Sequence, residues 1–315
     1  MRDSIPQTLG VDISKETLDV HLHPHGEAMR FSNDAKGFRA LVAWLGASTI
    51  ARIVYEPTGA YHRAFERRFF EAGFALCKIN PRQARRFAEA VGANAKTDAL
   101  DAHMLARFGA LLEPRTLAPP SQSLADMKDL LVARRALVKD RTAAQNRAQQ
   151  RSLALLKAQA AERLKQIERQ IAAIDAALRK HLANEPALKA RFDILVSIPS
   201  LSEVTAFAVL IEMPELGTLD NKTAASLAGL APMARDSGLW KGKRCIRGGR
   251  PALRCALYMP ALVAARFNGD LKAVYERLIA AGKPPKVAIV AVMRKLVILA
   301  NALLRDGRAW TPKRA

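Results

Sequence analysis

A long run without glycine or proline, from Ser121 to Glu185, is the feature that most limits how this chain can fold. Glycine and proline are the residues that most readily interrupt helices, so their absence over such a length predicts long helices. In the second half of the run, apolar residues recur alternately three and four positions apart, as in the seam of a coiled coil: Leu164, Ile167, Ile171, Ile174 and Leu178. One continuous helix in an oligomer and a helical hairpin that bends near residues 157–161 both fit this pattern.

A chain of 315 residues is long enough for more than one core. The helical run divides it into three expected parts. We expect a first domain over residues 1–112 and a C-terminal domain over residues 186–315. Between them we expect a linker and a coiled coil over residues 113–185, because three prolines lie between residues 113 and 120.

The first domain alternates strand and helix patterns in the order of the ribonuclease H fold. Leu18, Val20 and Leu22 alternate with polar residues, as in a strand with one buried face. The same reasoning predicts strands near residues 8–12, 18–22, 28–31, 50–55 and 74–79, and helices over 38–45, 61–72, 81–91 and from 98 onward. We therefore predict an α/β domain at the N-terminus.

Four acidic residues fall where this fold can gather them. Asp12 ends the first strand, Glu56 follows the fourth, and Asp98 and Asp101 lie three residues apart on one face of the last helix. Carboxylate oxygens suit Mg²⁺ or Mn²⁺, and two such ions can stabilise both oxygens of an in-line phosphoryl transfer. Each acid alone fits a turn or a surface charge as well, but the four together predict a metal site. Lys96, just before them, is either a phosphate contact or a solvated side chain.

The net charge indicates a polyanionic partner. The chain carries 50 Lys and Arg residues against 29 Asp and Glu residues, a formal net charge of +21. An excess of this size favours nucleic acid, rather than a membrane, as the ligand.

No feature of the sequence favours a membrane or secreted protein. The N-terminus lacks the apolar segment of a signal peptide. The apolar stretch from Val287 to Leu304 contains Arg294 and Lys295, and we expect it to be too short to cross a bilayer. The three cysteines form no CxxC pair and fit a reducing compartment. We therefore expect a cytoplasmic protein.

A basic, glycine-rich loop between residues 234 and 254 predicts a second site. Its glycines, among them Gly238, let the backbone approach a phosphate closely. Its cations, set against the single acid Asp236, are Arg235, Lys241, Lys243, Arg244, Arg247, Arg250 and Arg254. Ser237 lies among them and is either an ordinary turn residue or a nucleophile that the cations activate. The loop contains no histidine that could complete a hydrolase triad, so a base or a metal must come from elsewhere in the fold or from another subunit.

The segment from Leu195 to Ala206 resembles a helix–hairpin–helix turn, a motif whose main-chain N–H groups bind a phosphate backbone. Ser200 and Ser202 stand where the turn glycines are usual, so its role in DNA binding is open.

Segments at both ends of the chain resemble the DEDD-type insertion-sequence transposases. They are Val11-Asp12-Ile-Ser-Lys15, Glu56-Pro-Thr-Gly-Ala-Tyr61, Lys96-Thr-Asp-Ala-Leu-Asp101 and Ser237-Gly with the following Ile246-Arg-Gly-Gly-Arg and Leu253-Arg254. This family is related to the pilin-gene invertases and includes the bridge-RNA-guided recombinases.

The resemblance implies a RuvC-like N-terminal domain, a coiled-coil middle and a mainly α-helical C-terminal transposase domain with a catalytic serine. Asp12, Glu56, Asp98 and Asp101 would hold Mg²⁺ or Mn²⁺, and Ser237 would attack a DNA phosphodiester and hold one strand covalently. The resemblance also implies a structured guide RNA that selects the DNA by base pairing. We further expect double-stranded DNA as the partner and a homo-oligomer, either a dimer or a tetramer.

Three functions compete at this point. The first is a transposase or recombinase in which the acidic residues and Ser237 form one composite site. The second is a Holliday-junction-type nuclease in which metal-activated water attacks and Ser237 only lines the DNA site. The third is a non-catalytic nucleic-acid-binding protein that assembles through its coiled coil, for which the acidic residues and Mg²⁺ would be irrelevant.

Overall fold

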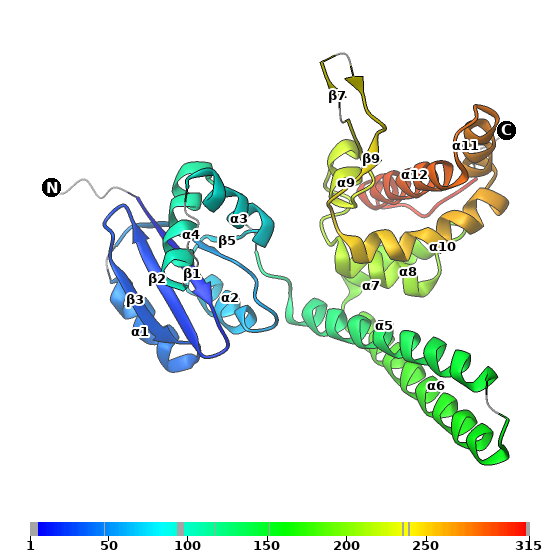
Figure 1. Ribbon diagram of the computed structural model, residues 1–315, viewed down its shortest axis with the longest axis horizontal. Helices are drawn as coiled ribbons and strands as arrows, with labels where there is room; N and C mark the ends of the chain where they lie inside the picture. Colours follow the sequence, from blue (N-terminus) through cyan, green and yellow to red (C-terminus); the bar gives the residue numbers. More distant parts are fainter. Residues whose placement is uncertain are drawn as a thin grey trace. The chain divides into compact units, whose positions relative to one another are not determined.

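The computed structural model describes residues 6–46, 48–92, 98–116, 118–150, 152–234, 236–238 and 240–312, with the backbone alone at residues 98 and 99. Two compact units make up the chain, Met1–Pro120 and Ser121–Ala315 (Figure 1). The helical run and the C-terminal residues thus form one unit, where the sequence suggested two separate parts.

The first unit is an α/β domain, as predicted. Its sheet has the strand order β3-β2-β1-β4-β5, in which β1, β2 and β3 form an antiparallel meander and β4 and β5 run parallel to β1. The strands are β1 (Gln7–Ile13), β2 (Thr17–His23), β3 (Ala28–Ser32), β4 (Ile50–Tyr55) and β5 (Leu76–Lys78); the helices are α1 (Ala35–Leu45), α2 (His62–Glu71), α3 (Pro81–Ala90) and α4 (Asp98–Leu112). Every strand and helix predicted here from the sequence is present, in the predicted order.

The strand β1 has two differently packed faces. Leu9, Val11 and Ile13 join the apolar cluster that includes residues of α1 and α2. The alternate face, which includes Gly10, is covered by α4, because a Cβ atom on Gly10 would lie 2.0 Å from the carbonyl oxygen of Ala102. The backbone of α4 therefore packs directly against the backbone of β1 at this glycine.

A second glycine fixes the direction of α4 across β1. A Cβ atom on Gly109 would lie 2.6 Å from Cγ2 of Thr8 and 2.4 Å from Cγ2 of Val54. Since Ala102 faces Gly10 and Gly109 faces Thr8, the helix runs antiparallel to the strand. The first turn of α4 consequently lies toward the carboxyl end of β1.

The helical run folds back on itself. The helices α5 (Gln122–Gln149) and α6 (Ala154–Ala183) are separated by residues 150–153, so the bend comes before residues 157–161, where the hairpin alternative placed it. Ile167 and Ile171 pack with Ala144 of α5, and Arg134 Nε donates to Asp175 Oδ1 at 2.6 Å across the pair. The predicted seam is thus buried within one chain.

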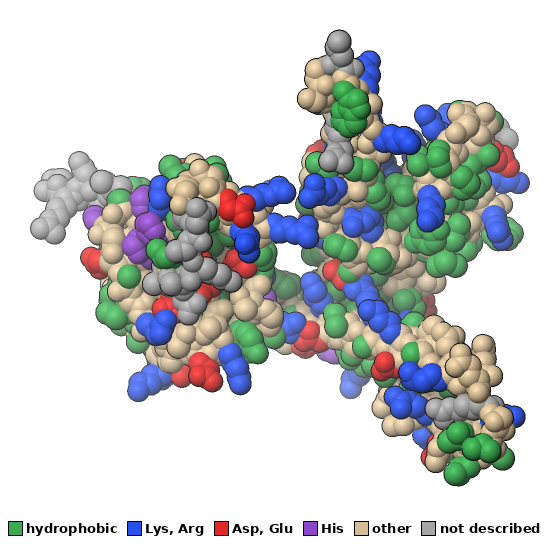
Figure 2. Space-filling model, viewed as in Figure 1, with side chains coloured by type: hydrophobic (Ala, Val, Ile, Leu, Met, Phe, Trp, Pro, Cys, Tyr) green, Lys and Arg blue, Asp and Glu red, His purple; other side chains and the backbone are tan. Residues whose placement is uncertain are grey.

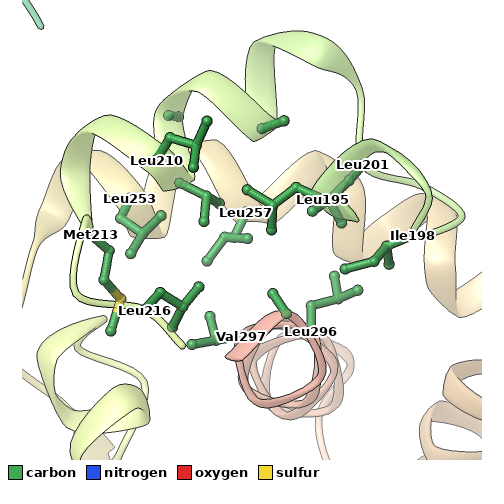
Figure 3. Close-up of a cluster of buried hydrophobic side chains, with 14 of the residues drawn as sticks. Leu195, Ile198, Leu201, Leu210, Met213, Leu216, Leu253, Leu257, Leu296 and Val297 are labelled. Carbon is green, nitrogen blue, oxygen red and sulfur yellow. The ribbon is translucent and has the colours of Figure 1, made fainter. Parts of the chain in front are cut away.

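The remaining helices of the second unit surround one apolar core. They are α7 (Pro186–Val196), α8 (Glu203–Glu212), α9 (Asn221–Leu227), α10 (Pro251–Phe267), α11 (Gly269–Ala280) and α12 (Pro285–Asp306). In Figure 3, Leu195 and Leu257 point toward Leu296 and Val297 of α12. The core of this unit is therefore built around α12.

The expectation that the last apolar stretch is too short to cross a bilayer is wrong. The helix α12 has 22 residues and is long and apolar enough by length and composition. Its apolar side chains, Ile289, Val292, Met293 and Leu303 among them, are instead buried in the core of the second unit. Packing, rather than length, accounts for its composition.

The predicted helix–hairpin–helix segment consists of α7 and α8 joined by a short turn. Ser200 has a φ of +90°, the conformation that a glycine would adopt without strain. Ser202 caps α8 by accepting a hydrogen bond from the Thr205 backbone N–H. The turn has the expected form, and its contact with a phosphate backbone stays a prediction.

We predict that Gly10→Ala destabilises the first unit by about 2 kcal/mol or more, because the added methyl group overlaps backbone atoms of α4 that have no other place to go. Urea unfolding followed by circular dichroism measures the change. Gly269→Ala is the matched control, since a Cβ atom at Gly269 has no heavy atom within 4 Å. Equal stability of the two variants would show that α4 does not depend on this glycine.

Candidate functional site

The carboxyl ends of β1 and β4 and the start of α4 lie at one edge of the sheet. Val11 is paired with Tyr55 in the parallel register of β1 and β4, so the next residues, Asp12 and Glu56, follow side by side. Strand alternation puts Asp12 on the same face as Gly10, the face that α4 covers. Asp101 directly precedes Ala102, whose carbonyl oxygen lies against Gly10. Three of the four predicted acids therefore come from elements that converge.

The fourth acid and the nearby lysine cannot be placed in the same way. Asp98 begins α4, but its side chain lies outside the described residues, as does Lys96 altogether. Among the side chains that the structure describes, no three His, Cys, Asp or Glu residues form a group that could hold a metal ion. The carboxylate set has the oxygen chemistry that Mg²⁺ requires, and the metal site itself stays a prediction.

Asp19 is an acid at this edge that the sequence reasoning missed. It is paired directly with Asp12 across β1 and β2, is only 8% exposed, and accepts a hydrogen bond of 2.9 Å from Arg30 Nε. Carboxylates directly opposite each other on a sheet repel, and the guanidinium of Arg30 offsets this charge. The short turn at Ser14, which places Asp12 across from Asp19, is the signal that could have identified it.

One asparagine links the chain segments that follow Asp12 and Glu56. Asn33 Nδ2 donates to the carbonyl oxygen of Ser14 at 2.8 Å and to that of Tyr61 at 3.2 Å. Ser14 lies in the turn after β1, and Tyr61 ends the loop after β4. The side chain of Asn33 thus holds together the two loops that flank the acidic edge.

A buried polar cluster supports the end of β4 from the opposite face of the sheet. Glu66 Oε1 accepts a hydrogen bond of 2.7 Å from Tyr55 Oη and pairs with Lys78 Nζ at 2.6 Å. Burial raises the pKa of Tyr55, and the nearby Glu66 carboxylate raises it further, so the phenol stays protonated and remains a donor. The residue before Glu56 is therefore firmly anchored.

The basic loop of the second unit forms a β-hairpin that projects from its helices (Figure 1). The root pairs β6 (Pro232–Met233) with β9 (Cys245–Ile246), and the tip pairs β7 (Asp236–Ser237) with β8 (Trp240–Lys241). Gly238 has a φ of +56°, as tight hairpin turns require. Ser237 is consequently an exposed residue at the tip.

The predicted cations of this loop fall into two groups, apart from Arg235, which lies outside the described residues. Exposed side chains along the hairpin form the first group: Lys241, Lys243, Arg244 and Arg247. Figure 2 shows Lys and Arg side chains in this region. They are accessible to a phosphate backbone.

The second group, Arg250 and Arg254, lies at the base of the hairpin and contacts the protein itself. Arg250 Nη1 donates to the carbonyl oxygen of Glu212 at 2.6 Å, and its Nη2 pairs with Glu215. Arg254 Nη1 donates to the carbonyl oxygen of Gly248. These contacts indicate a structural role for both arginines, and their predicted nucleic-acid contacts remain to be tested.

The chain is similar to transposases along most of its length. A family model described as "Transposase" (DEDD_Tnp_IS110) matches residues 9–158, and one described as "Transposase IS116/IS110/IS902 family" matches residues 192–276. The pilin gene-inverting protein of Moraxella lacunata is 29% identical over 318 residues, which cover 96% of this chain and 97% of that protein. The first model spans the predicted acids, and the second spans Ser237 and the basic hairpin.

Insertion-element proteins match over a shorter region. The uncharacterized 42 kDa protein of insertion element IS900 from Mycobacterium paratuberculosis is 32% identical over 126 residues, 38% of this chain and 31% of that protein. The uncharacterized 43.6 kDa protein of insertion element IS110 from Streptomyces coelicolor is 32% identical over 117 residues, 36% of this chain and 29% of that protein.

A histidine of α4, His103, packs against the sheet. The rings of His103 on α4 and His21 on β2 form an edge-to-face pair with centroids 4.6 Å apart. Burial lowers the pKa of both imidazoles; His103 and His23 lower the pKa of His21 further, and Arg107 and His23 lower that of His103. His21 is thus half-buried on a strand inside the sheet.

We predict that acidification loosens this packing. Because both folded-state pKa values lie below the unfolded value of about 6.5, the unfolded chain binds more protons, and stability falls as the pH drops below that value. In urea unfolding at several pH values, His103→Gln should reduce this loss, whereas His25→Gln, in an exposed turn, should leave it unchanged. An unaltered pH dependence in His103→Gln would contradict the prediction.

Proposed function

Because the chain belongs to the IS116/IS110/IS902 family of transposases, we propose that it cuts and rejoins DNA through a covalent bond between Ser237 and a DNA phosphate. The observation that carries the proposal is how the required groups are divided between the two units. The second unit carries an exposed serine among cations, and the first carries an edge of carboxylates. We infer that the acidic edge and the serine act together in the reaction, within one chain or between subunits of an oligomer.

The proposed reaction is a transesterification at phosphorus. The hydroxyl oxygen of Ser237 attacks the phosphate, gives up its proton, and displaces a deoxyribose oxygen, which leaves as a hydroxyl. Lys241, Lys243 and Arg244 stabilise the negative charge of the pentavalent transition state. The phosphoserine ester keeps the bond energy, so a hydroxyl of another strand can later displace Ser237 and join the DNA.

The first unit acts as a RuvC-like metal-binding domain in this proposal. Asp12, Glu56, Asp98 and Asp101 would hold Mg²⁺, or Mn²⁺ in its place, and the bound ion supplies positive charge for the phosphate and lowers the pKa of a coordinated hydroxyl. Arg30 pairs with Asp19 and so offsets part of the negative charge next to Asp12. Asn33 holds the flanking loops, and with them the two strand ends, in place.

Double-stranded DNA is the substrate, as the net charge of +21 favours. The similar pilin gene-inverting protein inverts a gene by name, and we propose inversion or insertion of DNA segments here as well. A structured guide RNA selects the sites by base pairing, and the protein works as a dimer or tetramer in the cytoplasm. Since α5 and α6 bury the heptad seam within one chain, other surfaces form the oligomer.

A junction-resolving nuclease is the second candidate, favoured by the acidic edge alone. Carboxylates that hold two metal ions suffice to activate water for phosphodiester hydrolysis. In such an enzyme Ser237 would contact the DNA without bonding to it.

We predict that the protein, expressed with its own flanking DNA, forms a covalent adduct with DNA and that Ser237→Ala abolishes both the adduct and strand exchange. Denaturing gels of nuclease-treated samples, followed by mass spectrometry of the modified peptide, detect the adduct. Ser226→Ala, which changes a serine on α9, is the control. Strand cleavage by Ser237→Ala without any adduct would support the nuclease, and strand exchange by Ser237→Ala would exclude the serine mechanism.

We also predict that Asp101→Asn lowers the rate of adduct formation at least about 100-fold, because the neutral amide weakens metal binding while preserving shape. Asp126→Asn, the same change on α5, should have no effect. Rates are measured against Mg²⁺ concentration. Full activity of Asp101→Asn and indifference to Mg²⁺ would contradict a role of this acid in metal binding. DNA binding without any adduct, unaffected by Asp101→Asn or by Mg²⁺, would favour the non-catalytic alternative.

A further inference from the structure

An exposed tryptophan lies beside the proposed nucleophile. Trp240 is paired directly with Ser237 across the tip of the hairpin and is 63% exposed. The other two tryptophans, Trp44 and Trp310, pack against the apolar cores of their units. In the described part of the chain, Trp240 belongs to no hydrophobic cluster.

The position of Trp240, more than its exposure, requires an explanation, because single exposed apolar residues are common on proteins. Directly opposite residues of an antiparallel pair have Cβ atoms about 5 Å apart and side chains on one face. The indole and the Ser237 hydroxyl therefore project from the same side of the hairpin. Whatever phosphate reaches Ser237 brings its neighbouring nucleotide to the indole.

The charges around Trp240 identify the class of ligand. Lys241 follows it in β8, and Lys243 and Arg244 continue along the exposed hairpin. Cations beside an exposed aromatic ring are the combination that binds unpaired nucleic acid, with the charges on the backbone and the ring on a base. The same cations would repel the equally basic hairpin of a second copy.

We propose that Trp240 is a positioning residue that stacks on an unpaired DNA base next to the phosphate attacked by Ser237. The inference rests on the proposed role of Ser237. Stacking fixes the nucleotide, and thereby the phosphate, relative to the serine hydroxyl. Because every base has a π-face, the contact tolerates any sequence. It requires a base that has left its partner, so it favours opened DNA over an intact duplex.

The stacking can be measured without the reaction. In the Ser237→Ala protein, the fluorescence of Trp240 should be quenched by a short single-stranded DNA of mixed sequence and much less by the corresponding duplex. Heparin, a polyanion without bases, should bind and leave the fluorescence unquenched. Trp240→Phe in the same background removes the signal and thus assigns it.

The affinity for single-stranded DNA should depend on an aromatic ring at position 240. Trp240→Ala should bind the single-stranded DNA about ten-fold more weakly, whereas Trp240→Phe should retain most of the affinity. Phe267→Ala is the matched control, because Phe267 is an exposed aromatic residue (79%) on α10, away from the hairpin. It should bind like the unmodified protein.

The outcomes separate this inference from the proposed function. Quenching and ring-dependent affinity in a protein that never forms the serine adduct would support stacking and refute the serine mechanism. An adduct that forms equally fast in Trp240→Ala and wild type, with unchanged DNA affinity, would overturn the stacking. Quenching by single-stranded RNA alone, or a protein-concentration-dependent shift without nucleic acid, would also overturn it.

Discussion

The acidic edge depends on the close packing of the α4 backbone against the backbone of β1. Gly10 on the strand and Gly109 on the helix leave room for it, since a Cβ atom at either position would overlap atoms of the other element. The close approach brings the start of α4 to the carboxyl end of β1, where Asp12 lies. Two residues without side chains thus decide where the acids can converge.

In the second unit, the base of the β-hairpin is held against the helices, whereas its tip is exposed. Arg250 and Arg254 join the base of the hairpin to α8 and to the loop around Gly248. Gly249 packs so closely against Gly229 that a Cβ atom would lie 2.2 Å from the Gly229 nitrogen. A tip that carries Ser237 can therefore extend into solvent while its base stays attached to the apolar core.

Much of the local structure could be predicted from the sequence because it depends on periodicity. Three patterns in the sequence each extend over only a few neighbouring residues. They are the alternation of Leu18, Val20 and Leu22, the heptad seam around Ile167 and Ile171, and the prolines that interrupt helices. For the same reason the four acids and Ser237 could be selected by residue type and by their places in the expected elements. Matches to the family models support the assignment of the chain as a transposase.

Contacts between distant residues could not be predicted in this way. By itself the sequence determined the order of the elements, the coiled-coil seam and the choice of chemically suitable side chains. Only the tertiary structure decided that this seam pairs within the chain, that Asp19 faces Asp12, and that Arg250 holds the hairpin base while Lys241 remains exposed. The physical reason is that strand register, helix approach and ion pairing depend on which surfaces meet in space, and residue spacing along the chain does not specify those surfaces.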